Sequence, residues 1–246
     1  MFIFQLETNG LAATNSVLKF NYVLINDEYN IIEKKAYYYL PVEPIDLYSI
    51  YHSSSDIRDV RIYLNRAHNF FIDDVENILQ ILNKDNKYIT FNKDFQLEHM
   101  PWFEFDEDSI FDVQWAYADW REGYSYGEVY PVMRKWIDII EELKIDADDK
   151  VEQILQAYLK LDTKERKNFE QKEILKSVSI NYEKLNAIRE TYIQEFITNY
   201  KKTLPRRGKY NLSKYTKELV SKIEQKQVDI KLQKLANFKT ELVKWD

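Results

Sequence analysis

Three residue types are absent or rare in this chain of 246 residues, and each shortage excludes a class of chemistry. There is no cysteine, which excludes disulfides, zinc–thiolate sites and a cysteine nucleophile. The four glycines are too few and too dispersed to build a glycine-rich phosphate-binding loop. Histidine occurs only as His52, His68 and His99, so the second half of the chain has no imidazole to act as a base.

Long apolar runs are also missing, and none approaches the length that a bilayer span requires. The start of the chain has neither a basic segment nor a cleavage site typical of a secretory signal. We therefore expect no membrane partner and a cytoplasmic location. A hydrophobic content of 45% with 31% charged residues predicts an ordered globular protein, either one large domain or one domain with a sizeable insertion.

The net charge of −6 is distributed unevenly along the chain. Residues 1–150 contain 28 acidic and 14 basic residues, a net charge of −14. Residues 151–246 contain 13 acidic and 21 basic residues, a net charge of +8. The first part is therefore a poor general binder of nucleic acid, whereas the second part is compatible with it.

Hydrophobic periodicity predicts strands first and helices afterwards. Residues 2–6 and 17–25 favour strands, and a third strand runs on to Leu40, where Pro41 ends it. A helix is predicted over 70–83, then a buried strand over 88–91 and another short helix. The order is β-β-β-α-β-α, and from about residue 113 onward the pattern is helical.

Short motifs occur at the ends of these predicted elements. They are QLETNGL at residues 5–11, YHSSSD at 51–56, FNKDFQ at 91–96 and the pair Asp112-Val113. In order and spacing the set resembles the DEDDh exonucleases, the DnaQ-like branch of the ribonuclease H-like fold, over residues 1–115 and 208–246. The resemblance implies an α/β fold, a ribonuclease H-like mixed five-stranded sheet flanked by helices, with a large helical insertion.

The resemblance also implies three segments. Residues 1–124 are expected to form the N-terminal part of the exonuclease-like core, and residues 125–200 the helical insertion. Residues 201–246 are expected to supply a basic segment and a C-terminal helix that completes the core.

Family members hydrolyse a phosphodiester with two divalent ions, Mg²⁺ or Mn²⁺, held by four carboxylates and assisted by a histidine base. In this sequence the four carboxylate positions and the histidine position fall on Gln5, Glu7, Gln96, Asn237 and Leu232. Only Glu7 keeps its charge, and one carboxylate with three amides cannot offset four positive charges. The resemblance therefore implies a pseudoenzyme with no catalytic residues, no metal site and no cofactor.

Amides in place of carboxylates remove charge and keep most of the shape. We therefore expect a hydrogen-bonded polar plug in which Gln5 or Gln96 donates to Glu7; the alternative is that these residues simply line a strand end. Asp94 and Glu98 flank Gln96 and are expected to point elsewhere. Restoring Asp at 5, 96 and 237 with His at 232 is expected to recover manganese binding in calorimetry.

Two segments are candidates for binding a partner. Residues 201–217 contain seven basic residues and no acid, interleaved with tyrosine, which suits single-stranded nucleic acid. The candidate nucleic-acid contacts are Lys201, Lys202, Arg206, Arg207, Lys209, Tyr210 and Lys214. The candidate protein contacts are Trp115, Trp120, Tyr124 and Tyr126, next to the acidic residues 104–108. A solvated loop and ordinary packing of the aromatic residues are the structural alternatives.

Three functions remain open on the sequence alone. The first is an inactive exonuclease-like protein that binds a protein or a single-stranded nucleic acid. The second is a working, metal-dependent 3′–5′ exonuclease whose ligands are displaced from the family positions. The third is a helical interaction protein with a coincidental N-terminal resemblance. The sequence does not determine the oligomeric state.

Overall fold

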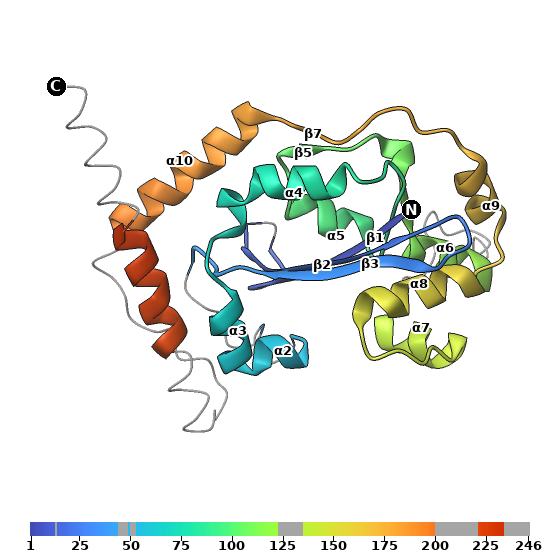
Figure 1. The fold of residues 1–246 in the computed structure, drawn as a ribbon, viewed down its shortest axis with the longest axis horizontal. Helices are drawn as coiled ribbons and strands as arrows, with labels where there is room; N and C mark the ends of the chain where they lie inside the picture. Colours follow the sequence, from blue (N-terminus) through green and yellow to red (C-terminus); the bar gives the residue numbers. More distant parts are fainter. Residues whose placement is uncertain (13, 44–48, 50–52, 123–134, 200–220, 234–246) are drawn as a thin grey trace. The chain divides into compact units, whose positions relative to one another are not determined.

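The computed structural model describes residues 1–12, 14–43, 49, 53–122, 135–199 and 221–233. The strands are β1 (Phe2–Thr8), β2 (Val17–Ile25), β3 (Ile31–Tyr38), β4 (Tyr88–Thr90), β5 (Phe103–Glu104), β6 (Ile110–Asp112) and β7 (Ser179–Ile180). The α-helices labelled in Figure 1 are α2 (Ser55–Arg58), α3 (Val60–Arg66), α4 (Val75–Leu82), α5 (Lys93–Glu98), α6 (Val113–Glu122), α7 (Trp136–Leu143), α8 (Lys150–Lys160), α9 (Lys164–Gln171) and α10 (Tyr182–Asn199). Two 3-10 helices are η1 (Phe71–Asp73) and η2 (Glu107–Ser109), and residues 221–233 are also helical.

The main sheet has five strands in the order β3-β2-β1-β4-β6. Strand β4 pairs in parallel with β1 and with β6, and Tyr88 lies opposite both Phe2 and Ile110. Strands β1 and β2 run in opposite directions, since the Ile25 amide donates to Met1 O at 3.0 Å and the Asn9 amide donates to Ser16 O at 2.8 Å. The sheet is therefore mixed, as the sequence predicts.

The chain forms two compact units, each made of several segments. Unit 1 contains Met1–Leu6, Phe20–Ala36 and Val75–Asn186. Unit 2 contains Glu7–Lys19, Tyr37–Asp74 and Ala187–Asp246. The predicted segment boundaries near 124 and 200 fall outside the described residues, and they stay predictions.

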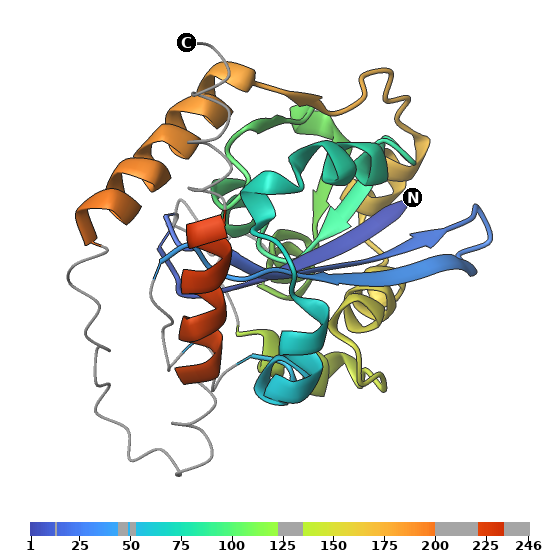
Figure 2. The same ribbon diagram turned by 60° about the vertical axis from the view of Figure 1, so that its left-hand side comes forward.

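In unit 1 the strand alternation gives the sheet two apolar faces. On one face the rings of Phe2 and Tyr22 stack at 4.8 Å, Phe2 also contacts the Tyr88 ring, and the Tyr88 hydroxyl donates to Leu82 O of α4 at 3.1 Å. Helices α4 and α5 lie on the same side of the sheet (Figures 1 and 2). The other face contributes residues such as Ile3 and Phe111 to a cluster that includes the α8 residue Ile154. Both faces of the sheet are thus covered by helices, which is how an α/β sheet buries its apolar side chains.

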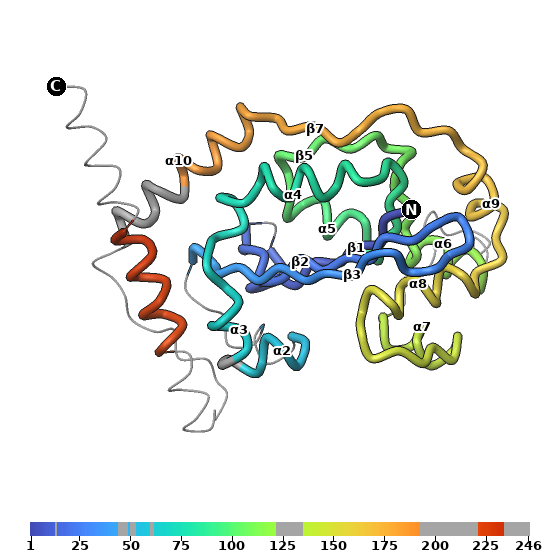
Figure 3. The backbone as a smooth tube through the Cα atoms, in the orientation of Figure 1, coloured from blue at the N-terminus to red at the C-terminus, as the bar shows by residue number. Residues whose placement is uncertain are grey.

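A second, two-stranded sheet joins distant parts of unit 1. Strands β5 and β7 pair antiparallel, with Phe103 opposite Ile180, and Figure 3 traces them side by side. The prediction of purely helical structure after residue 113 is wrong here. A strand of two residues is too short to leave a periodic pattern, so only the pairing partner reveals it.

Unit 2 contains the last residues of β1 and β3 and the first residues of β2. The Tyr63 hydroxyl of α3 is buried and donates to Tyr39 O. Helix 221–233 buries Ile223, and the Gln227 side chain donates to Pro41 O at 2.6 Å. Helices α2 and α3 were not predicted, whereas the first three strands, β4 and the helix near 70–83 were, the last as η1 followed by α4.

Candidate functional site

Strand β1 presents the first two family positions, Gln5 in unit 1 and Glu7 in unit 2. The Gln5 side chain is buried, and its Nε2 donates to Leu6 O at 3.1 Å. Its Oε1 is also buried and accepts no hydrogen bond within the described part of the chain. Gln5 is therefore held by backbone rather than by another polar side chain.

Gln96 lies fully buried in the short helix α5. The turn before α5 is made by Asn92, whose left-handed conformation (φ 57°) places its side chain to accept from the Phe95 amide at 3.3 Å. Gln96 Oε1 accepts from the Leu6 amide at 2.8 Å, and Nε2 donates to Phe91 O at 3.1 Å. Both ends of this amide are thus used to tie α5 to the sheet.

Glu7 is held by unit 2. Its Oε2 accepts from the Ser54 amide at 2.7 Å, and its Oε1 lies 3.5 Å from the Lys19 ammonium. Both side chains are buried, with 7% of Glu7 and 6% of Lys19 exposed. A carboxylate removed from water to this degree needs a compensating charge, and Lys19 supplies it.

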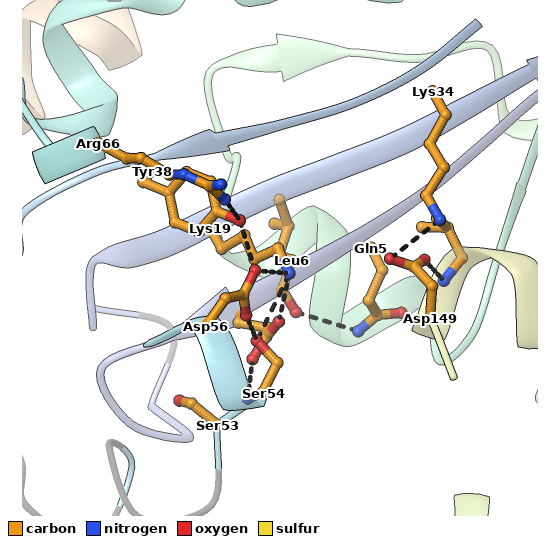
Figure 4. Close-up of polar contacts among 12 residues, drawn as sticks. Gln5, Leu6, Lys19, Lys34, Tyr38, Ser53, Ser54, Asp56, Arg66 and Asp149 are labelled. Carbon is orange, nitrogen blue, oxygen red and sulfur yellow. Dashed lines mark hydrogen bonds and ion pairs between the residues drawn. The ribbon is translucent and has the colours of Figure 1, made fainter. Parts of the chain in front are cut away.

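Lys19 also pairs with a second carboxylate, which the family positions do not include. Its ammonium lies 2.8 Å from Asp56 Oδ2 and 3.5 Å from Ser54 Oγ. The Tyr38 hydroxyl donates to the same Asp56 oxygen, and Arg66 donates to the Tyr38 hydroxyl at 2.9 Å. Figure 4 shows Lys19, Tyr38 and Asp56 converging from two strands and one helix. We call Glu7, Lys19, Tyr38, Ser54, Asp56 and Arg66 the Lys19 cluster.

The ionisation of this cluster follows from its contacts. Burial by itself disfavours the ammonium, but the charges of Glu7 and Asp56 outweigh it and raise the pKa of Lys19. Burial also opposes the Asp56 carboxylate, yet hydrogen bonds from Lys19, Ser54 and Tyr38 lower its pKa to about 2. Lys19 and Asp56 are therefore both charged at neutral pH.

The prediction that Gln5 or Gln96 donates a hydrogen bond to Glu7 is wrong. Gln5 and Gln96 donate to backbone carbonyls, and Glu7 is engaged instead by the Ser54 amide and the Lys19 ammonium. The physical reason is that amide donors next to a strand end find backbone acceptors close by, whereas a buried carboxylate is stabilised most by a cation.

The family implies two divalent ions, and the residues at the described family positions do not fit them. Gln96 has both polar ends occupied, and Glu7 faces a protein ammonium that repels a second cation. Gln5 Oε1 is one neutral oxygen. Within the described residues no group of three or more His, Asp or Glu side chains could hold a metal ion.

The remaining family positions lie near the C-terminus. Leu232 is on helix 221–233 with 39% of its surface exposed, and Asn237 lies outside the described residues. The Asp112 carboxylate at the end of β6 accepts from the amides of Asn92, Lys93 and Gln114 at 3.1, 2.8 and 2.8 Å. Burial raises the pKa of Asp112, and these amide donors oppose the rise. This carboxylate has a structural role, since it joins the turn before α5 to the start of α6.

The two acidic neighbours of Gln96 behave as predicted. Asp94 and Glu98 are exposed, whereas Gln96 between them is fully buried. A displacement of two residues on α5 turns their carboxylates to the opposite side of the helix from Gln96. Neither can therefore stand in for the family ligand at position 96.

The candidate binding residues are only partly described. On α6, Trp115 is 37% and Trp120 is 44% exposed. Tyr124, Tyr126 and the seven candidate nucleic-acid contacts, Lys201, Lys202, Arg206, Arg207, Lys209, Tyr210 and Lys214, lie outside the described residues. Within those residues no helix combines the length and apolar character that a membrane span requires.

Sequence reasoning missed Lys19 and Asp56 as members of the site. A signal for each was present, because Lys19 lies on the polar side of an alternating strand and Asp56 ends the YHSSSD motif. Nothing in the sequence pairs two residues 37 positions apart, so their ion pair is a product of the tertiary structure.

Comparisons with known proteins bear on the fold. The sequence matches no protein-family model, and no curated protein is similar to it in sequence. Among solved structures, an exonuclease I without ligand is similar with a TM-score of 0.50 and 16% identity, covering 68% of this chain and 43% of that protein. Exonuclease X in complex with 5′ overhanging duplex DNA gives a TM-score of 0.43 and 15% identity, covering 65% of this chain and 89% of that protein.

E. coli exonuclease I in complex with a 5cy-dA13 oligonucleotide gives a TM-score of 0.48 and 16% identity, covering 68% of this chain and 41% of that protein. The chain thus spans less than half the length of exonuclease I. Together with the strand order of the mixed sheet, the likeness to exonuclease I shows that this chain shares its fold, a ribonuclease H-like mixed five-stranded sheet flanked by helices, at low sequence identity.

Proposed function

We propose that this protein uses the exonuclease fold to bind a partner and does not hydrolyse nucleic acid. The observation that supports this most directly is the pairing of Glu7, the one surviving family carboxylate, with the Lys19 ammonium and the Ser54 amide. Two-ion hydrolysis needs carboxylates that are free to bind divalent ions, and here the cationic partner is already part of the chain. The amides of Gln5 and Gln96 give no anionic replacement.

The partner is a single-stranded nucleic acid. Exonuclease folds are built to receive a nucleic-acid strand, and loss of the metal ions removes hydrolysis without removing the surfaces that contact the strand. The basic residues of 201–217 supply cations for phosphate contacts, and the interleaved tyrosines supply rings for base stacking.

The hydrolysis test uses a labelled single-stranded oligonucleotide with Mg²⁺ or Mn²⁺. We expect the oligonucleotide to stay intact, with no difference when EDTA is added. Metal-dependent shortening from the 3′ end would overturn the proposal and favour a working exonuclease with displaced ligands.

The binding test uses fluorescence anisotropy of the same oligonucleotide at several salt concentrations. The double variant Arg206→Ala/Arg207→Ala is expected to bind more weakly, and the slope of log K against log salt is expected to fall by about 1.4, at roughly 0.7 for each lost phosphate contact. The control is Lys164→Ala/Lys167→Ala, which removes two charges from exposed positions on α9 and is expected to leave the slope unchanged. Salt-independent binding would argue against a nucleic-acid partner.

A protein partner is the second candidate, and the exposure of Trp115 and Trp120 favours it. Large aromatic side chains left partly in water on one helix are typical anchors of protein interfaces. We expect Trp115→Ala/Trp120→Ala to abolish recovery of a specific partner from native cells while leaving oligonucleotide binding unchanged. Recovery of the same partner by wild type and variant would exclude this surface.

A further inference from the structure

We propose that the Lys19 ammonium is a built-in counter-ion that fills a cation position formed by Glu7 and Asp56. A divalent cation would bind there only after this ammonium is removed. The inference rests on the proposed function, because it assumes that the intact site holds no divalent ion.

The geometry defines one cation position with ligands from separate elements. Glu7 on β1 and Asp56 on α2 approach the same nitrogen of Lys19 at 3.5 and 2.8 Å. Ser54 Oγ approaches the same nitrogen at 3.5 Å. Carboxylate and hydroxyl oxygens converging on one point are the donors that Mg²⁺, Mn²⁺ and Ca²⁺ prefer.

The burial of Glu7 shows that this position requires a cation. Glu7 Oε1 is buried and accepts no hydrogen bond among the described residues, so the Lys19 charge at 3.5 Å is its compensation. An unpaired buried carboxylate would be strongly destabilising. Glu7 Oε1 thus faces the Lys19 ammonium and forms an ion pair with it, but no hydrogen bond.

The other charged and polar groups of the cluster do not replace Lys19. Arg66 reaches Asp56 only through the Tyr38 hydroxyl, and Ser54 already donates its amide to Glu7 and its hydroxyl to Asp56. Without Lys19 the carboxylates of Glu7 and Asp56 would repel each other in a poorly solvated place. A divalent ion would relieve that repulsion, and an ammonium and a divalent ion cannot share the position.

The test compares thermal unfolding of full-length variants with and without 1 mM Mn²⁺. Lys19→Met keeps the side-chain length and removes the charge, and we expect Mn²⁺ to raise its Tm by about 5 °C, as expected for a site with a dissociation constant of roughly 50 µM. Wild type and Lys19→Arg are expected to show no shift. The double variant Lys19→Met/Asp56→Asn is expected to bind Mn²⁺ at least about tenfold more weakly than Lys19→Met does. Calorimetry or the electron paramagnetic resonance signal of Mn²⁺ measures this affinity.

Lys35→Met is the matched control, because it makes the same change at a lysine whose side chain is 53% exposed. It is expected to behave as wild type. A Lys19→Met protein that Mn²⁺ does not stabilise, whether folded or not, overturns this inference and leaves the proposed function intact. Stabilisation of wild type by Mn²⁺ would instead overturn the proposed function.

Discussion

At the scale of single residues, burial decides what the Glu7 carboxylate does. Glu7 has the residue type of a metal ligand, but its environment makes it half of an ion pair with Lys19. The same type of side chain at an exposed position would gain little from a lysine, since water screens the attraction. A variant that restores Asp at positions 5, 96 and 237 and His at position 232 still has the Lys19 ammonium beside Glu7. We therefore expect Mn²⁺ binding to return fully only when Lys19→Met is added to that variant.

The ionisation of Asp56 gives a prediction for the pH dependence of stability. Its folded pKa of about 2 lies below the unfolded value, so its stabilising contribution is present above about pH 4 and is lost as pH falls toward 2. We expect Asp56→Asn to lower the free energy of unfolding at pH 7 by on the order of 2 kcal/mol. Urea unfolding at several pH values measures this; a difference from wild type that did not shrink between pH 5 and pH 2 would contradict it.

At the scale of elements, one buried carboxylate organises two neighbouring turns. Asp112 ends β6, and its carboxylate accepts hydrogen bonds from backbone amides at the start of α5 and in the first turn of α6. Backbone donors at a helix start need acceptors, and a buried amide without one is costly. The Asp112-Val113 motif is thus explained by capping and does not require catalysis.

Removal of this cap should be measurable. We expect Asp112→Ala to lower the free energy of unfolding by about 2 kcal/mol, because three partly buried amides lose their acceptor. Urea denaturation followed by circular dichroism checks this. The control Asp162→Ala changes an exposed aspartate and should have little effect; equal losses in both variants would show that the cap has no special role.

At the scale of the whole molecule, residues far apart in sequence share one core. In unit 1 the strand residues Ile3, Ile89 and Phe111 pack in the same cluster as Ile154 and Tyr158 of α8. Helix α8 lies within the segment predicted as an insertion, yet its apolar face is part of the packing of the sheet. We therefore expect this segment and the sheet to unfold together.

A core substitution in α8 tests this expectation. Ile154→Ala should lower the free energy of unfolding by about 2–5 kcal/mol while keeping a single transition for the tryptophan and circular dichroism signals. Ile137→Ala in α7, where 55% of the side chain is exposed, should cost far less. A separate early transition in Ile154→Ala would show that the helices form an independent domain.

The sequence by itself determined the order of the first strands and helices and the presence of two amides, Gln5 and Gln96, where the resemblance predicts carboxylates. Alternating and helical periodicities are local, and so is the loss of charge at a named position. It also determined that no histidine follows position 99.

Only the tertiary structure decided how the remaining charges are compensated. Lys19 meets Glu7 and Asp56 because β1, β2 and α2 converge, and β5 pairs with β7 across 75 residues. Both are contacts between distant segments, whose free energy depends on burial and geometry that no local pattern encodes. For that reason the fold was largely predictable, whereas the partner of the Glu7 carboxylate was not.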